Sequence, residues 1–280
     1  MLYSLNLDFN YFHPYSLNTF CININEDYRF KKSSIAEKII IKAKDDGYKS
    51  IVEFDTKTNL IKTEKRILTN GDAYEATFYY NKENLKLEQV IIKNSTTKET
   101  LEKIEVEYSS KKIKIRKKYF YIEYELVHNK IDTVTIFDKK FDCIDCMLKF
   151  SYNELNKIVK VEEYSQFENN ENDEINILDN PKLLFITNIK EQLNSNILEI
   201  EYNVEDLTDK TTEKKVYKFN QFGLIISENF YSKTKDSINS QILYEYEFNS
   251  SNDWVKKTAK RKHLLIDTKE TCKIIEREII

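Results

Sequence analysis

The chain has 280 residues, of which 40% are hydrophobic and 32% charged, and its formal net charge is −3. This hydrophobic content can bury a sizeable core, so the composition excludes a globally disordered chain. The near-balance of charge argues against a dedicated nucleic-acid-binding protein, which carries a clear basic excess.

The expected compartment is the cytoplasm. No stretch approaches the roughly 18 apolar residues of a membrane span, and the N-terminal residues lack the basic start and apolar run of a signal peptide. The four cysteines are too few for a disulfide scaffold. A secreted or surface location remains the alternative, if a signal peptide has been removed.

The first 35 residues lack the repeating pattern of the later chain. Repeat arrays usually need capping segments at their ends. We therefore expect residues 1–35 to form an N-terminal cap or strand pair, followed by a repeat domain at 36–280.

From residue 36 onward, apolar and charged residues alternate with a period of two. In KKIKIRKK, Ile113 and Ile115 fall on one side, with Lys112, Lys114 and Arg116 on the other. EVEYS, EIEYN and LYEYEFN alternate in the same way. Successive strand side chains point to opposite faces, so the pattern predicts strands with one apolar and one charged face. One short helix is expected, at Leu183–Leu193.

A recurring unit lies on this pattern: aromatic–x–aromatic–Asn/Asp/Ser, a short polar turn, and a new strand opened by Leu, Ile or Trp. Several copies are roughly 25 to 30 residues apart, the length of two strands and two turns. Asn and Asp suit the turn because they bond their own backbone and tolerate left-handed geometry. The marker residues are Phe54, Tyr80, Tyr108, Tyr152, Tyr202, Phe219 and Phe248, with Trp254 opening the strand after the last copy.

The unit resembles the YD repeats of bacterial Rhs-type and polymorphic-toxin proteins, and the hairpin repeats of many Bacteroidetes proteins. The likeness is clearest in VYKFNQFGLIISENFY and ILYEYEFNSSNDWVKK. The usual Asp is mostly Asn here, and the turn glycine survives only at Gly223. The resemblance implies a long antiparallel sheet that coils to enclose, scaffold or bind, and carries no chemistry of its own.

The number of strands has a geometric consequence. About seventeen strand-like segments in a flat ribbon would extend over roughly 80 Å and expose their aromatic face far beyond what a soluble monomer tolerates. Sheet twist favours rolling. The expected fold is therefore all-β, a long antiparallel hairpin meander rolled into an open barrel, a spiral or a two-layer sheet.

Cys143 and Cys146 form a C-x-x-C pair, a spacing that can bind zinc or act in redox chemistry. A structural zinc needs two more ligands, and the nearest histidine is His128. Cys21 and Cys272 lie elsewhere, and there is no second C-x-x-C or H-x-x-H pair. The pair is therefore a weak candidate for a metal site, and the alternative is that the two thiols have no function. No cofactor is expected.

A strongly acidic stretch interrupts the repeat and predicts an exposed loop insertion near 162–180. An acidic surface of this kind would attract a basic protein partner, a nuclease toxin among them. The alternative is a disordered insertion without a partner. The candidate binding residues are Glu162, Glu163, Glu168, Glu171, Asp173 and Glu174.

Two basic stretches, Lys111–Lys118 and Lys256–His263, lie next to aromatic residues. Basic grooves with stacking rings suit single-stranded nucleic acid, but lysines on solvated strand faces also guard against edge-to-edge aggregation. Given the overall charge, we favour the second interpretation and do not expect nucleic-acid binding.

The sequence contains no recognisable catalytic motif, and its three histidines are isolated. The interpretation that follows is a non-enzymatic bacterial protein-binding module, most concretely an immunity or antitoxin-type protein whose partner is another protein, such as a toxin. One alternative is a surface, secreted or phage structural repeat protein. Another is a carbohydrate-active enzyme or binder using dispersed carboxylates.

Overall fold

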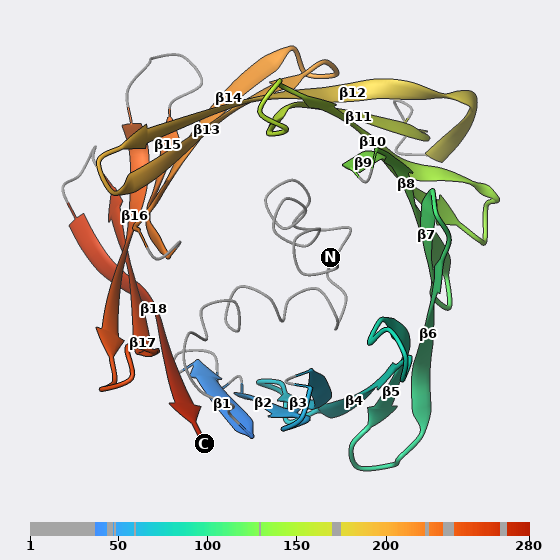
Figure 1. Ribbon diagram of the computed structural model, residues 1–280. Coiled ribbons are helices and arrows are strands. Elements are labelled where there is room, and N and C mark those ends of the chain that lie inside the picture. Colours follow the sequence, from blue (N-terminus) through green and yellow to red (C-terminus); the bar gives the residue numbers. More distant parts are fainter. Residues whose placement is uncertain are drawn as a thin grey trace.

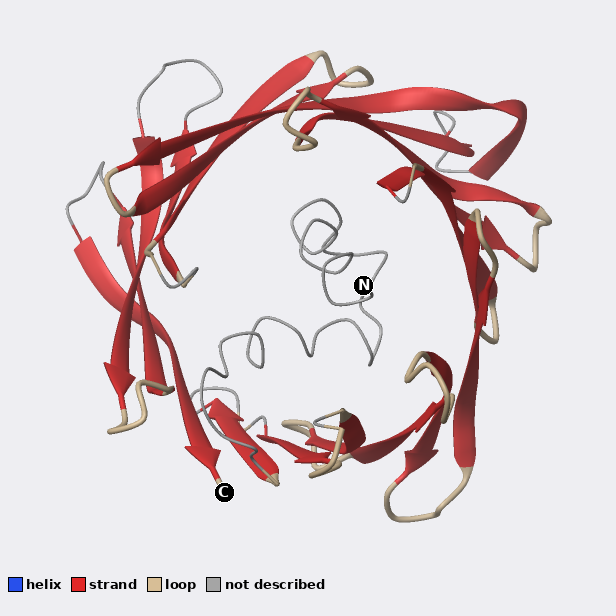
Figure 2. Cartoon of the chain, viewed as in Figure 1, coloured by secondary structure: helices blue, strands red, loops and turns tan. Residues whose placement is uncertain are grey.

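The computed structural model describes residues 37–43, 47, 49–58, 60–128, 130–169, 175–221, 224–231, 238–263 and 268–280. These residues form eighteen β-strands in one sheet, and every neighbouring pair is antiparallel. Figure 2 shows only strands and loops among the described residues. The all-β hairpin meander expected from the sequence is therefore confirmed. The predicted N-terminal cap at 1–35 lies outside the described residues.

The strands follow the chain order around the sheet. Their bounds are β1 Lys38–Ala43, β2 Lys49–Phe54, β3 Ile61–Ile67, β4 Ala73–Tyr80, β5 Leu87–Asn94, β6 Thr100–Tyr108, β7 Lys112–Arg116, β8 Phe120–Val127, β9 Lys130–Asp138, β10 Cys143–Tyr152, β11 Ile158–Asn169, β12 Ile175–Asn194, β13 Ile197–Asp206, β14 Thr211–Phe219, β15 Ile225–Tyr231, β16 Ile238–Phe248, β17 Trp254–His263 and β18 Thr268–Ile279.

The sheet closes on itself. β1 pairs with β2 on one side and with β18 on the other, where Ile39 faces Ile279 and Ile41 faces Arg277. The result is a barrel, which Figure 1 shows as a ring of strands. Closure pairs both edges of the sheet and so removes the free edges that would otherwise template aggregation. We call the region where β18, β1, β2 and β3 meet the seam wall.

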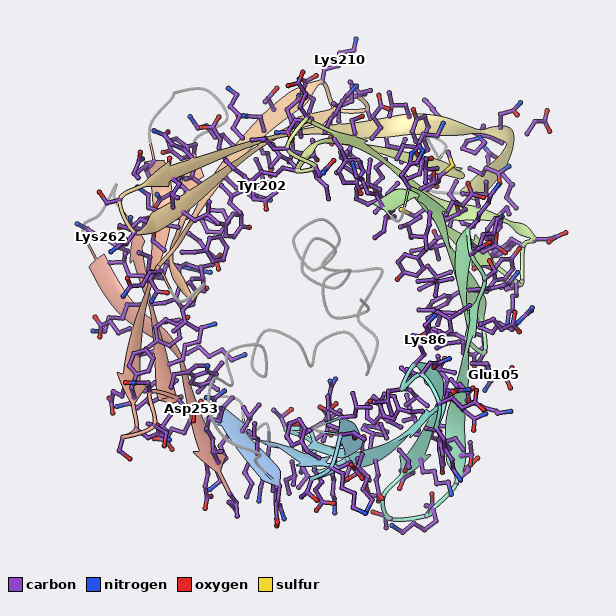
Figure 3. The ribbon with its side chains drawn as sticks, viewed as in Figure 1. Lys86, Glu105, Tyr202, Lys210, Asp253 and Lys262 are labelled. Atoms are coloured by element: carbon purple, nitrogen blue, oxygen red, sulfur yellow. The ribbon has the colours of Figure 1, made fainter. Side chains whose placement is uncertain are left out.

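The two faces of the barrel differ in chemistry. In Figure 3, Tyr202 points into the ring and Glu105 points away from it. Because side chains alternate along each strand, the strand register assigns every position to the lumen or to the exterior. The lumen face carries the apolar clusters. Its most deeply buried members are Ile39, Val52, Ala76, Val90, Ile104, Ile122, Val134, Ile136, Leu148 and Val161.

The exterior carries ladders of opposite charges. On β6 to β8, Arg116 lies 2.9 Å from Glu107, and Lys114 lies 2.6 Å from Glu123. Glu107, Lys114 and Glu123 lie directly opposite one another across the three strands, and Arg116 reaches Glu107 diagonally. Similar pairs join β13 to β14 and β16 to β17: Lys218 with Glu199, Lys214 with Glu201, and Lys260 with Glu245.

The turns use side-chain hydrogen bonds in place of glycine. The Asn153 side-chain oxygen accepts bonds from the backbone N–H groups of Leu155 and Lys157, both at 3.0 Å. This is the role that the sequence predicted for the residue after the aromatic pair. Asp55, Asn81, Asn94, Asp138, Asp206, Asn220 and Asn249 accept comparable bonds in their own turns.

Left-handed turn positions are filled by ordinary residues. Leu85 has a φ of 55°, Lys98 of 61° and Lys210 of 54°. A side chain in this region costs on the order of 1 kcal/mol relative to glycine. The hydrogen bonds between the paired strands of each hairpin hold these residues in place. This explains how a barrel of this size is built with three glycines.

Three local predictions are wrong. The expected helix Leu183–Leu193 lies within β12, which is paired along its length with β11 and β13. The expected loop begins too early, because Glu162 and Glu163 lie within β11, which continues to Asn169. The turn expected after Tyr202 does not form, since β13 runs on to Asp206. In each case pairing with two neighbouring strands outweighs the local sequence preference.

Replacing Asn153 with alanine should lower the free energy of unfolding by about 1 kcal/mol, because two backbone N–H groups lose their acceptor. Urea denaturation measures the change. Asn153→Asp is the matched control, since the aspartate keeps an acceptor oxygen and should stay within about 0.5 kcal/mol of the parent. Equal losses in both variants would contradict the assigned role of the side chain.

Candidate functional site: the barrel lumen

Six of the seven repeat marker residues gather at one end of the lumen. Phe54, Tyr80, Tyr108, Tyr152, Phe219 and Phe248 each end an even-numbered strand, and the turns after even-numbered strands all lie at the same end of an up-and-down barrel. We call this set the aromatic rim. Tyr202 also faces the lumen but lies within β13.

Cations and further rings pack against these aromatic residues. The Lys86 ammonium lies 4.9 Å from the ring centre of Tyr108. Tyr202 and Tyr217 pack edge to face at 5.4 Å, and Tyr246 packs edge to face with Trp254 at 6.2 Å. Aromatic surfaces with polar tips suit binding to another polypeptide, because they combine large contact area with hydrogen-bonding groups.

Tyr108 has a buried hydroxyl that remains protonated. Burial, with a smaller contribution from the nearby Glu88 carboxylate, raises the pKa of Tyr108 to about 12. The hydroxyl makes no hydrogen bond within the described part of the chain. A buried hydroxyl favours a partner, so the Tyr108 hydroxyl keeps a donor available on the lumen face.

The seam wall carries a polar cluster on its lumen face. The Ser50 hydroxyl donates to Glu64 Oε1 at 3.0 Å, and Arg66 Nε donates to the same oxygen at 2.6 Å. Nearby on β18, Arg277 Nε donates to the Trp254 carbonyl at 2.8 Å, and its guanidinium lies 4.2 Å from the Trp254 ring centre. The cluster therefore presents both signs of charge within an otherwise apolar wall.

Cys143 and Cys146 are brought to the same face by a β-bulge. The register shifts between Ile144 and Cys146, so that both cysteines align with lumen-facing positions of β9. Gln166 supports the bulge by accepting the Ile144 N–H at 2.6 Å. Both thiols are buried, and neither is part of a disulfide. Among the described residues, no group of three or more His, Cys, Asp or Glu side chains is placed to hold a metal.

The two thiols should resist alkylation in the folded protein. Burial raises the pKa of Cys146, and the Glu163 carboxylate adds to that shift; burial also raises the pKa of Cys143. Because the thiolate is the nucleophile, a raised pKa leaves little reactive form even at pH 8. Iodoacetamide followed by peptide mass spectrometry should show both unmodified in buffer and fully modified in urea. Rapid labelling of Cys146 in buffer would contradict this.

The acidic candidates do not form one surface within the described residues. Glu162 lies on the exterior, 2.7 Å from Lys160, whereas Glu163 faces the lumen beside Cys146. Glu168 lies in β11, and nothing further is described of its side chain. Glu171, Asp173 and Glu174 lie outside the described residues.

The basic stretches are matched by acidic neighbours. Lys112 lies 2.8 Å from Glu125, and Lys114 and Arg116 belong to the exterior ladder described above. In the second stretch, Lys256 pairs with Glu247. These contacts fit solvated strand faces, the interpretation favoured from the sequence.

No protein-family model and no curated protein matches the chain. Among solved structures, a porin-like protein from Bacteroides uniformis is similar over 89% of this chain and 98% of its own, with 14% identity and a TM-score of 0.50. A porin-like protein from Bacteroides vulgatus covers 89% and 99%, with 7% identity and a TM-score of 0.41. The TcdB2–TccC3–Cdc42 structure covers 81% of this chain and 14% of its own, at 8% identity and a TM-score of 0.38.

The first of these likenesses shows a shared fold. The chain and the Bacteroides uniformis protein align over nearly their whole lengths, so the closed all-β barrel is an architecture already seen in a solved structure. A closed barrel fits a β-repeat protein, and the YD-repeat resemblance remains one of sequence pattern. Among the described residues, no helix is long and apolar enough to span a membrane.

Proposed function

We propose that this protein is a non-enzymatic barrel that works in water and binds another polypeptide along its lumen wall. The observation that carries the proposal is the division of the wall into an apolar, aromatic lumen face and a charged exterior. Barrels of about 16 to 18 strands are too wide for their own side chains to fill. An apolar wall around such a space favours an occupant that buries it.

The charged exterior supports a water-exposed barrel. A barrel that spans a membrane needs an outward-facing apolar band about 25 Å tall, and Arg or Lys at the bilayer midplane costs about 2–4 kcal/mol each. Here Lys103, Glu105 and Glu107 follow one another on the exterior of β6, and β7 and β8 continue the ladder. This is the reverse of the polar lumen and apolar exterior of a porin.

A polypeptide suits this lumen better than a small ligand. The wall combines aliphatic surface with tyrosines and isolated polar anchors spread over many strands, which matches an extended chain with alternating side chains. The more specific form of the proposal is an immunity-type protein in the cytoplasm that holds a segment of a toxin. A carbohydrate-active site would instead need two free, close carboxylates, and Glu64 is engaged by Ser50 and Arg66.

The second candidate is a secreted or surface protein, favoured by the fold shared with a porin-like protein. It is compatible with a water-exposed exterior and differs in compartment and partner. Cell fractionation with an antibody against the protein distinguishes the two. Recovery in the soluble cytoplasmic fraction supports the immunity-type form, and recovery at the cell surface or in the medium supports the second.

Site-specific photo-crosslinking tests the binding mode. Benzoylphenylalanine at Tyr246 places a probe on the lumen face, and the same probe at Glu245 places it on the exterior of the same strand. In producing cells, we expect the Tyr246 probe to capture one discrete partner that then binds the purified protein with a measurable Kd. Capture by the Glu245 probe alone, or no partner from either position, would overturn the proposal.

A further inference from the structure

We propose that this protein also docks on an anionic membrane surface, through two neighbouring turns at the end of the barrel opposite the aromatic rim. The turns are residues 117–119, between β7 and β8, and residues 139–142, between β9 and β10; we call them the end patch. Both turns follow odd-numbered strands, and β7 to β10 lie side by side in the sheet (Figure 1). The proposal goes beyond lumen binding and does not depend on it.

The two turns share one sequence pattern, Lys-Lys followed by an aromatic residue. The first reads KKY and the second KKFD, so together they hold four lysines and one acidic residue. Two other described turns at this end balance their charges: Lys98 precedes Glu99 between β5 and β6, and Asp209 precedes Lys210 between β13 and β14. The excess of positive charge is therefore a feature of the end patch.

Hydrogen bonds join the two turns into one surface. The Lys139 N–H donates to the Tyr119 carbonyl at 2.9 Å. Within the second turn, Asp138 Oδ1 accepts the backbone N–H groups of Lys140 at 2.7 Å and Phe141 at 3.1 Å. Because the backbone of both turns is held in this way, docking would require little further ordering.

Two aromatic residues are exposed in the end patch. Tyr119 is 66% exposed and Phe141 is 42% exposed. Phe141 packs edge to face with Phe167 at 5.8 Å, and on the adjoining exterior of β8 and β9 the rings of Tyr121 and Phe137 stack at 4.5 Å. Aromatic residues of this kind gather at the interface of a bilayer, at the level of the lipid headgroups.

The exposed lysines of the end patch contact rings and backbone. The Lys118 ammonium lies 5.0 Å from the ring centre of Tyr119, and the Lys140 ammonium lies 4.7 Å from that of Phe141. The Lys139 ammonium donates to a backbone carbonyl of the first turn. Within the described part of the chain none of these three ammonium groups pairs with a carboxylate, unlike the lysines of β7. Their charge therefore remains available to anionic headgroups.

A bilayer fits the end patch better than a nucleic acid does. Single-stranded nucleic acid needs a basic groove that follows its backbone over several nucleotides, whereas the positive charge here is confined to two turns. Carboxylates border the patch: the Lys118 N–H donates to Glu102 at 3.4 Å, and the exterior ladder of the adjoining strands carries Glu107 and Glu123. A flat surface can contact the exposed turns without meeting these carboxylates.

Docking at this end would orient the barrel. The aromatic rim lies at the opposite end and would face the solution, so a polypeptide could still enter the lumen from there. Attachment at headgroup level needs only a few inserted rings and nearby lysines. The charged exterior of the barrel therefore stays in water.

Vesicle binding with a tryptophan reporter tests the proposal. The chain has one tryptophan, Trp254, which is 2% exposed, so a second one on a turn reports its own surroundings. Tyr119→Trp places the reporter in the end patch, and the matched control Leu155→Trp places it on a turn at the aromatic-rim end, where Leu155 is 77% exposed. With vesicles of phosphatidylcholine and about 30% phosphatidylglycerol, we expect a blue shift and quenching by brominated lipid for Tyr119→Trp alone.

Co-sedimentation of the parent protein with the same vesicles measures the contribution of charge. Vesicles of phosphatidylcholine alone should bind at least about tenfold more weakly, and the pair Lys118→Gln with Lys140→Gln should weaken binding to anionic vesicles about twentyfold, since each lysine near the surface contributes about fivefold. The control pair is Lys57→Gln with Lys82→Gln, on turns at the aromatic-rim end. It should bind like the parent, and thermal unfolding confirms that both pairs are folded.

Three results would overturn the proposal. The first is the absence of a shift for Tyr119→Trp with anionic vesicles, or an equal shift for Leu155→Trp. The second is an equal loss of binding in the two lysine pairs. The third is tight binding of a single-stranded oligothymidylate without vesicle binding, which would identify a nucleic acid as the ligand. None of these results depends on the capture of a partner at Tyr246, so either proposal can fail alone.

Discussion

Replacing Glu64 with alanine is expected to lower the free energy of unfolding by about 3 kcal/mol. Glu64 is buried on the lumen face and accepts hydrogen bonds from Ser50 and from Arg66. Removing one partner of a buried ion pair leaves the other charge uncompensated, which typically costs about 3–5 kcal/mol. Urea denaturation of the purified variant, followed by tyrosine fluorescence, measures the loss.

Two further variants separate the ion pair from ordinary truncation. Glu105→Ala removes an exposed partner of Lys103 on the exterior and should change stability by less than about 1 kcal/mol. The double variant Glu64→Leu with Arg66→Leu removes both buried charges and should recover much of the loss, because apolar side chains can replace a buried pair at little cost. A double variant as unstable as Glu64→Ala would show that packing, and not the charge, is what the site requires.

Placing the same polar residue on the two faces of β5 should lower the stability by very different amounts. Val90→Asn puts an amide into the lumen-facing apolar cluster, where Val90 is 0% exposed, and should cost about 3 kcal/mol through lost apolar contact and a poorly paired amide. Gln89→Asn changes the adjacent exterior position and should cost less than about 0.5 kcal/mol. Thermal and urea unfolding of both variants provide the comparison.

This pair of variants bears directly on the proposed function. If the exterior faced lipid, the exterior position would be the sensitive one, and both variants would need detergent to remain in solution. Equal or reversed sensitivities would remove the division of faces on which lumen binding depends. The expected order, with Val90→Asn much less stable than Gln89→Asn and both monodisperse without detergent, would support a barrel that works in water.

The lumen site itself was only partly predictable. The aromatic residues of the repeat could be assigned to one face from their period of two, and the strand register places that face in the lumen. The sequence did not indicate the buried polar cluster of Glu64, Arg66 and Arg277. A charged residue at a position where the alternation predicts an apolar one only breaks the pattern, and its hydrogen-bonding partners are unknown until the neighbouring strands are placed. The faces of the acidic stretch were equally hard to assign: Glu162 and Glu163 are adjacent in sequence but lie on opposite faces of β11.

The sequence by itself determined where most strands and turns of this protein lie and which side chains share a face of each strand. Alternating side chains define two chemically distinct faces, and Asn or Asp after an aromatic pair ends a strand, because both effects act within a few residues. Tertiary structure decided closure of the sheet, since β1 and β18 lie at opposite ends of the described chain and their pairing depends on the accumulated twist of eighteen strands. It also decided that the aromatic face turns inward, because only a closed wall can shelter that face from water.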